Sequence, residues 1–196
     1  MNTRVITVFG SSRPREEDPD YQEAFQLGCA LGTAGFDVCT GGYGGVMEAV
    51  SRGAKTVGAM TYGVTTGFFK LCANAWVDKE IRVDSWQARL FELIRIGDGF
   101  VACKGGTGTL AEIAVVWEML NKAVMAGKPF VVLGDFWVPI GQRFGRAFKA
   151  RYVAARSVTR GSTSLLNSVR LATVSSWSNN PPCPIINRCP KPPTWS

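Results

Sequence analysis

Phe100-Val-Ala-Cys-Lys-Gly-Gly-Thr-Gly-Thr-Leu-Ala-Glu112 is the stretch that decides the fold class of this chain. Its first four residues predict a buried strand, its glycines predict a turn, and the residues from Thr109 predict a helix. Backbone N–H groups in such a turn can converge on an anion, and the positive end of the helix dipole adds to the attraction. The stretch therefore predicts a phosphate site, with the Glu112 carboxylate within reach of a sugar attached to that phosphate.

A second interpretation of Glu112 rests on the same residues. Thr109-Leu-Ala-Glu112 fits the S/T-x-x-E capping box, in which Glu112 would only satisfy the first amides of its own helix. The residues from Thr109 to Glu112, taken alone, support both interpretations equally. Three glycines in one short turn favour the anion site, because a plain strand-to-helix turn seldom needs three residues without a Cβ.

Strands and helices alternate along the first 140 residues. The patterns predict strands over residues 4–9, 36–39, 60–66, 80–83, 100–103 and 128–133, and helices over residues 18–35, 46–58, 86–96 and 109–126. This order predicts an α/β fold, a single Rossmann-like domain with a doubly wound parallel sheet. Ligands of such sheets bind at the carboxyl ends of the strands, where the turn at Gly105 and a second glycine-rich turn, Thr40-Gly-Gly-Tyr-Gly-Gly45, both fall.

The segment between the third and fourth predicted strands has no regular pattern. We expect residues 67–80 to be irregular, with Phe68, Phe69 and Trp76 packed against the domain or against a partner subunit.

The charge of the chain is unevenly distributed. Residues 1–140 hold 13 Lys and Arg and all 15 Asp and Glu, a net charge of −2, whereas residues 141–196 hold nine basic and no acidic residues. We therefore divide the chain into a nucleotide-binding domain, residues 1–140, and an atypical basic segment, residues 141–196. A basic helix is predicted over residues 141–156 and disorder after about residue 175, and a solvated tail explains the charge better than nucleic-acid binding.

Several functional classes are excluded by composition. The chain has no histidine, which removes Ser-His-Asp and Cys-His catalysis and most zinc sites, so we predict no metal and no cofactor. The six cysteines form no C-x-x-C pair, and Cys29, Cys39, Cys72 and Cys103 lie in segments that predict reduced, buried thiols. No apolar run has the length of a membrane span and no signal peptide is recognised, which predicts a cytoplasmic protein.

The central stretch resembles the signature P-G-G-x-G-T-x-x-E of the LOG family, the cytokinin riboside 5′-monophosphate phosphoribohydrolases once misnamed lysine decarboxylases. Gly105, Gly106, Gly108, Thr109 and Glu112 match it, and Lys104 replaces the proline. Arg89 is similar in its spacing to an arginine of the family. Val8-Phe-Gly-Ser-Ser12 and Thr40-Gly-Gly-Tyr-Gly-Gly-Val-Met-Glu-Ala49 are similar to its two other nucleotide-contacting turns, so the resemblance covers residues 4 to about 140.

The resemblance implies a substrate and a reaction. The substrate would be a nucleoside 5′-monophosphate, AMP or an N6-modified AMP such as a cytokinin riboside monophosphate, hydrolysed to free base and ribose 5-phosphate in cytokinin activation. Glu112 would stabilise the positive charge that develops on the ribose ring. Arg89 would keep Glu112 ionised by lowering its pKa and would also contact the substrate. The alternative for Arg89 is a charge on the surface of its helix.

The resemblance also implies binding residues and a quaternary structure. The phosphate would contact Gly10, Ser11, Gly42, Gly44, Gly45, Lys104, Gly105, Gly106, Thr107, Gly108 and Thr109. For Ser11 the alternative is a polar turn residue. Met47 and Glu48 would line the base pocket, although Met47 fits a core position equally well. Members of the family are homodimers or larger, so a homo-oligomer is expected.

Two other functions compete with the hydrolase. A non-enzymatic nucleotide or molybdenum-cofactor carrier of the same fold would use the glycine turns without needing the pair of Arg89 and Glu112. A dinucleotide-dependent oxidoreductase is suggested by Gly106-x-Gly108-x-x-Ala111, but Asp135 lies 29 residues after Gly106 rather than about 20. A pyridoxal-phosphate decarboxylase is disfavoured, because no lysine is placed as a Schiff-base partner.

Overall fold

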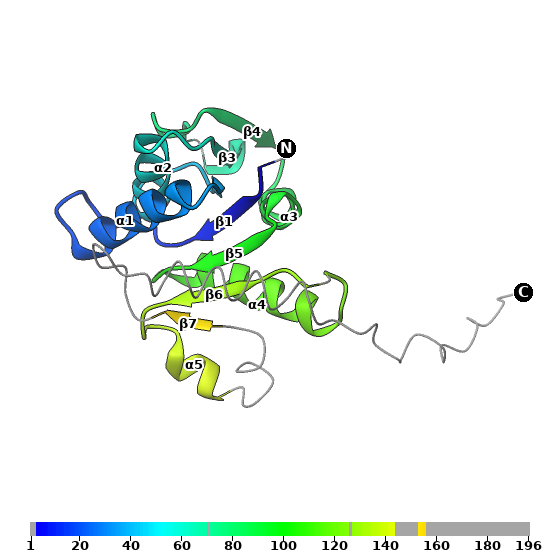
Figure 1. Ribbon diagram of the computed structural model, residues 1–196. Coiled ribbons are helices and arrows are strands. Elements are labelled where there is room, and N and C mark those ends of the chain that lie inside the picture. Colours follow the sequence, from blue (N-terminus) through cyan, green and yellow to red (C-terminus); the bar gives the residue numbers. More distant parts are fainter. Residues whose placement is uncertain (1–2, 70, 126, 144–152, 156–196) are drawn as a thin grey trace, which may run out of the picture.

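A parallel sheet runs through the centre of the chain in the computed structural model, which describes residues 3–69, 71–125, 127–143 and 153–155 (Figure 1). Its strands are β1 (Val5–Phe9), β2 (Asp37–Thr40), β3 (Thr61–Thr66), β4 (Lys79–Val83), β5 (Gly99–Ala102), β6 (Phe130–Leu133) and β7 (Val153–Ala155). The helices are α1 (Pro19–Thr33), α2 (Val46–Thr56), α3 (Trp86–Ile96), α4 (Thr107–Asn121) and α5 (Val138–Arg143), with a short 3₁₀ turn, η1 (Gly67–Phe69). The predicted α/β fold class is confirmed.

The strand order places a crevice in the middle of the sheet. The order is β4-β3-β2-β1-β5-β6-β7, and every neighbouring pair is parallel. β1 pairs with β2 on one side and with β5 on the other, so the chain reverses its direction of travel across the sheet between β1 and β5. Ligands of open parallel sheets bind at this switch point, beyond the carboxyl ends of the strands.

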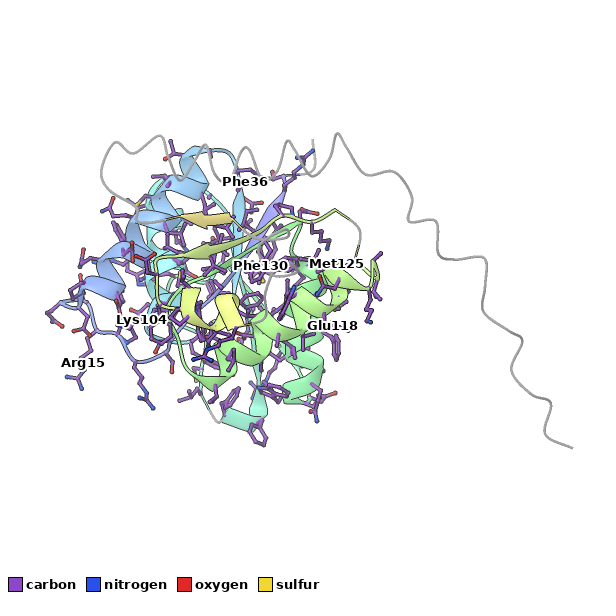
Figure 2. All side chains as sticks on the ribbon, turned by 90° about the horizontal axis from the view of Figure 1, so that it is seen from below. Arg15, Phe36, Lys104, Glu118, Met125 and Phe130 are labelled. Carbon is purple, nitrogen blue, oxygen red and sulfur yellow. The ribbon has the colours of Figure 1, made fainter. Side chains whose placement is uncertain are left out.

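Helices cover both faces of the sheet. On one face Leu27 and Leu31 of α1 pack with Val50 of α2 over β1, and on the other Leu93 of α3 and Val116 of α4 pack over β1 and β5. The backbones of α1 and α2 approach closely, because a Cβ on Gly28 or Gly53 would collide with the main chain of the other helix. In Figure 2 Phe130 of β6 lies among the side chains of this interior.

α1 and α3 begin and end close to the bounds that the sequence predicts. Asp18 is the N-cap residue of α1 with Pro19 in the first turn, and Gly35 follows the helix at φ +84°. α3 has the predicted bounds, and the Ser85 side chain accepts a hydrogen bond from the Ala88 N–H.

Two helices end earlier in the chain than the sequence predicts. α4 stops at Asn121 rather than at residue 126, because the backbone turns to φ +54° at Ala123. The helix predicted over residues 141–156 is wrong in its last part: α5 ends at Arg143, and Val153–Ala155 form β7 beside β6. The apolar β6 thereby gains a partner on its outer edge, and the sheet takes its last strand from beyond residue 140. The predicted disorder after about residue 175 lies outside the described residues.

The cysteine prediction is correct for two of four thiols. Cys39 and Cys103 are buried, Cys29 is half-buried and Cys72 is exposed, and all four are free. Burial raises the pKa of Cys39 to about 12, so this thiol is inert at neutral pH.

Within the described ranges, no helix is both long enough and apolar enough to cross a bilayer, and no cluster of side chains is suited to hold a metal ion.

Candidate active site

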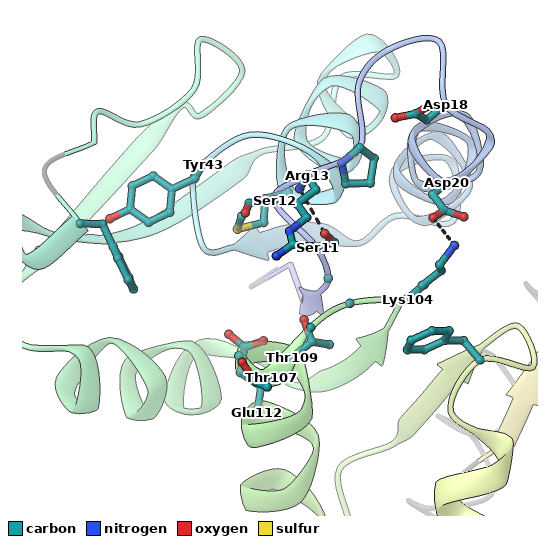
Figure 3. A pocket seen from close by; sticks show the side chains of 18 of the residues that line it. Ser11, Ser12, Arg13, Asp18, Asp20, Tyr43, Lys104, Thr107, Thr109 and Glu112 are labelled. Carbon is teal, nitrogen blue, oxygen red and sulfur yellow. Dashed lines mark hydrogen bonds and ion pairs between the residues drawn. The ribbon is translucent and has the colours of Figure 1, made fainter.

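Three loops enclose a cavity of about 960 Å³ at the carboxyl ends of β1, β2 and β5 (Figure 3). Main-chain hydrogen bonds join these loops: the Ser11 N–H donates to the Lys104 carbonyl over 3.1 Å, and the Val46 N–H donates to the Ser11 carbonyl over 2.8 Å. The cavity therefore lies at the switch point, with a wall fixed from three parts of the chain.

The turn between β5 and α4 forms one wall, lined by residues 104–109. α4 begins at Thr107, with Gly106 as its N-cap residue and no side chain capping it, so its first amides have no acceptor within the helix. Neither Gly106 nor Gly108 has a positive φ, and a Cβ added to either would meet no atom within 4 Å. Folding therefore does not demand glycine at these two positions, and the open space lies where a ligand would approach the backbone.

The capping-box interpretation of Glu112 is wrong. Thr109 is the third residue of α4 and is buried rather than standing at the N-cap position. Glu112 lies three residues further along the helix, lines the cavity and keeps 14% of its side chain exposed. Its carboxylate is thus directed to the cavity instead of to the helix's own amides.

Arg89 is held beside this carboxylate by the main chain. It lies in the first part of α3 and is only 7% exposed, which excludes the surface-charge interpretation. Its Nε donates to the Val64 carbonyl over 2.8 Å and its Nη2 to the Gly41 carbonyl over 3.0 Å. The ring of Tyr43 lies 5.3 Å from the guanidinium carbon, and that of Phe69 lies 5.7 Å from it.

The remaining guanidinium nitrogen faces Glu112. Arg89 Nη1 lies 4.0 Å from Glu112 Oε1. Burial raises the pKa of Glu112 to about 7, and the charge of Arg89 offsets only part of that rise. The predicted net lowering of this pKa is therefore wrong, because loss of hydration outweighs attraction to a cation at this distance.

The structure brings most, but not all, of the other predicted residues to the cavity. Gly10, Ser11, Met47 and Lys104 line it, and Met47 is also buried, so both interpretations of that residue hold. Lys104 places its Nζ 2.8 Å from Asp20 Oδ2. The predicted residues that do not line the cavity are Gly42, Gly44, Gly45 and Glu48.

Sequence reasoning missed several residues of the wall. Tyr43 stands between the glycines of the turn after β2, and its hydroxyl exchanges hydrogen bonds with the Thr66 backbone over 3.0 and 3.1 Å. Arg13 follows Ser12 in the loop after β1, where the Pro14 next to it was the available signal of a constrained position. The remaining wall residues that were not predicted include Phe69, Leu71, Trp86 and Phe136.

Comparisons with known proteins place this arrangement in a family. A profile of the SLOG cluster4 family matches residues 3–151. The chain is 33% identical over 133 residues to an uncharacterized protein of Archaeoglobus fulgidus, which covers 68% of this chain and 85% of that protein. It is 34% identical over 123 residues to a probable cytokinin riboside 5′-monophosphate phosphoribohydrolase of Oryza sativa subsp. japonica, which covers 60% of this chain and 50% of the rice protein.

A solved structure with the same architecture is that of the molybdenum cofactor binding protein from Rippkaea orientalis. The two superpose with a TM-score of 0.66 and 29% sequence identity, covering 81% of this chain and 92% of the other. The family match spans strands β1 to β6, both glycine turns, Arg89 and Glu112, and the chain belongs to the SLOG cluster4 family, a LOG-like family.

Proposed function

We propose that the protein hydrolyses the N-glycosidic bond of a nucleoside 5′-monophosphate, AMP or an N6-modified AMP, and releases the free base and ribose 5-phosphate. The observation that carries this proposal is the pair formed by the buried Arg89 and the half-buried Glu112, in the wall of a cavity that also contains an open glycine turn. The phosphate and the reacting sugar carbon would thereby each meet a different group of the same cavity.

The glycine turn supports binding of the phosphate. The first amides of α4 point their N–H groups towards the N-terminal side of the helix, and the helix dipole adds about half a positive charge there. The free space at Gly106 and Gly108 lets a phosphate oxygen approach the main chain without meeting a side chain. The 5′-phosphate is therefore assigned to this turn.

Glu112 supplies the chemistry at the anomeric carbon. As the bond to the base lengthens, positive charge spreads over the ribose ring, and an ionised carboxylate beside the ring stabilises that charge. Water then adds its oxygen to the anomeric carbon, one water proton goes to the departing base, and the sugar keeps the hydroxyl. With a pKa of about 7, Glu112 carries its negative charge in roughly half of the molecules at neutral pH.

Arg89 positions Glu112 and lines the same cavity, where the substrate would contact it. Its two hydrogen bonds to the main chain at Val64 and Gly41 fix the guanidinium, so that Nη1 faces the carboxylate from one side. The nearby positive charge favours the ionised carboxylate that the reaction requires.

A molybdenum-cofactor carrier is the second candidate. It is favoured by the likeness to the Rippkaea orientalis protein, and by a cavity of about 960 Å³, near the upper limit of ordinary ligand pockets. A carrier needs the anion site but has no use for a buried carboxylate at the pKa of a general base. The rice relative, matched over half its length, supports the hydrolase.

We also infer that the enzyme works in the cytoplasm as a homodimer or larger assembly. Phe91 on α3 is 55% exposed and Trp86 at the start of the same helix is 36% exposed, so this helix presents apolar surface that a second subunit could cover. Light scattering coupled to size-exclusion chromatography tests the assembly, and a monomeric mass would contradict it.

Base release decides between hydrolase and carrier. AMP and N6-isopentenyl-AMP are incubated with the native protein, Glu112→Gln and Glu48→Gln, and the products are separated by chromatography. Glu48 is the matched control, because it lies on the helix after the other glycine turn and outside the cavity. We expect Glu112→Gln to lose about 10²- to 10⁴-fold in kcat and Glu48→Gln to keep the native rate.

Two outcomes contradict this assignment. Equal base release by Glu112→Gln and the native protein would remove Glu112 from the reaction. No base release by any of the three proteins, together with a molybdenum cofactor copurifying with the native chain, would establish the carrier instead.

A further inference from the structure

Three basic side chains line the cavity within the described part of the chain: Arg13, Lys104 and Arg89. Two of them are already engaged. Lys104 forms an ion pair with Asp20 over 2.8 Å. Two nitrogens of Arg89 donate hydrogen bonds to main-chain carbonyls, and its third nitrogen faces Glu112. Arg13, by contrast, forms no ion pair with any acidic residue that the structure describes.

The backbone at Arg13 is fixed rather than loose. Its N–H donates to the Ser11 hydroxyl over 3.1 Å, and the main chain of Ser11 is bonded to both neighbouring loops. Pro14 follows, and a residue before proline is restricted to extended backbone conformations. Figure 3 shows the Arg13 side chain extending from this loop towards the cavity, on the side of Ser11.

The proposed substrate requires a cation that the glycine turn does not supply. A phosphate monoester carries a charge of about −1.5 to −2 at neutral pH. The turn offers neutral N–H donors and about half a positive charge from the helix dipole. A guanidinium binds a phosphate through two parallel hydrogen bonds and brings a full positive charge that does not titrate.

From these observations we propose that Arg13 binds the 5′-phosphate and makes the site select phosphorylated nucleosides over nucleosides. This inference rests on the proposed nucleotide function and adds a specificity residue outside the family signature. The phosphate lies between two elements, the amides at the start of α4 and the guanidinium from the loop after β1. Lys104 keeps its partner Asp20.

Calorimetric titration of AMP and of adenosine tests the proposal on the native protein, Arg13→Gln, Arg13→Lys and Arg15→Gln. Arg15 is the matched control: it belongs to the same loop, is exposed, does not line the cavity, and projects from the periphery of the molecule in Figure 2. We expect Arg13→Gln to weaken AMP binding about 10- to 100-fold and adenosine binding by less than about threefold. Arg13→Lys falls between, and Arg15→Gln binds both as the native protein does.

Each remaining outcome has a definite meaning. Equal weakening of AMP and adenosine by Arg13→Gln would show that Arg13 shapes the loop and would overturn the proposal, as would AMP binding equal to that of Arg15→Gln. If the native protein releases no base while Arg13→Gln loses AMP selectively, the hydrolase fails and the phosphate ligand stands. If base is released and Arg13→Gln behaves as Arg15→Gln does, only the phosphate assignment fails. A native protein that binds no AMP overturns both.

Discussion

The two glycine-rich turns of the chain look alike in sequence and differ in what their glycines do. In the turn after β2, Gly42 and Gly45 have φ values of +76° and +68°, and a Cβ on Gly45 would collide with the backbone of Ser12. In the turn after β5, Gly106 and Gly108 have neither a positive φ nor a close neighbour. Gly42 and Gly45 of the first turn are needed for folding, whereas Gly106 and Gly108 of the second leave room for a ligand.

A glycine-rich turn marks a binding site only where folding does not require its glycines. Composition alone made both turns candidates for a phosphate site, yet only the second lines the cavity with its glycines. The side chains that the first turn gives to the cavity wall are Tyr43 and Met47. A glycine that neither the backbone conformation nor packing requires is the better marker of a binding position.

Substituting a folding glycine has the largest expected effect on stability. Gly45→Ala forces a side chain into a backbone region that is nearly closed to other residues, φ +68° and ψ −133°, and against the Ser12 backbone. We expect a loss of about 2–4 kcal/mol in the free energy of unfolding, measured in urea. A loss below about 0.5 kcal/mol would remove the folding role of this turn.

The matching substitution in the other turn is expected to harm binding instead. Gly106→Val fills the free space with a side chain that tolerates an extended backbone, and we expect about 100-fold weaker AMP binding by calorimetry. The free energy of unfolding should change by less than about 1 kcal/mol, because no atom lies within 4 Å of the added Cβ. Native AMP affinity in this variant would contradict the assignment of the space to a phosphate.

The acid that follows the second turn makes stability depend on pH. The pKa of Glu112 is about 7 in the folded protein, above its ordinary value, so between about pH 4.5 and pH 7 the folded state binds more protons than the unfolded state. The stability associated with the protonated carboxyl is present at low pH and is lost as the pH rises through 7. Going from pH 5 to pH 8, we expect the native protein to lose about 1–3 kcal/mol relative to Glu112→Gln.

Urea unfolding of both proteins at pH 5, 6, 7 and 8 measures this difference. The same ionisation predicts that kcat/KM for AMP rises with pH and levels off above about pH 7, because the proposed hydrolysis needs the carboxylate. Parallel stability curves for the two proteins would show that Glu112 keeps an ordinary pKa.

The smallest expected effect is an increase in stability on substitution of Gly108. Gly108 lies in the first turn of α4, where alanine is a better helix former and meets no neighbour. Gly108→Ala should therefore raise the free energy of unfolding by about 0.5–1 kcal/mol while weakening AMP binding. Increased stability with unchanged binding would mean that this glycine is not part of the ligand site.

Much of the fold could be predicted, because its signals are local. The bounds of α3 follow from the spacing of Leu90, Leu93 and Ile94 with Ser85 before them, and α1 follows from Asp18 and Pro19. β7 could not be predicted, because Val153-Ala-Ala is too short to carry a period and its partner β6 lies 20 residues away in sequence. The helices are determined by residues close in sequence, whereas the pairing of β7 depends on contacts with a strand that is distant in sequence.

The candidate site also has features that the sequence predicts and features that depend on the rest of the fold. Arg89, Glu112 and the turn at Gly105 could be found because they carry a signature. The sign of the Glu112 pKa shift could not, since it depends on how much of the carboxylate the rest of the chain covers. Arg13 escaped notice because an exposed arginine in a loop is ordinary until the cavity beside it is seen.

The anchoring of Arg89 on the carbonyls of Val64 and Gly41 has a consequence for how this lineage could diverge. A descendant without the proposed activity would still require the arginine to hold the ends of β2 and β3 together, whereas Glu112 meets this framework at its 4.0 Å ion pair with Arg89, so its replacement would leave those two hydrogen bonds intact. Among such sequences, loss of Glu112 rather than loss of Arg89 would mark a change from hydrolase to carrier.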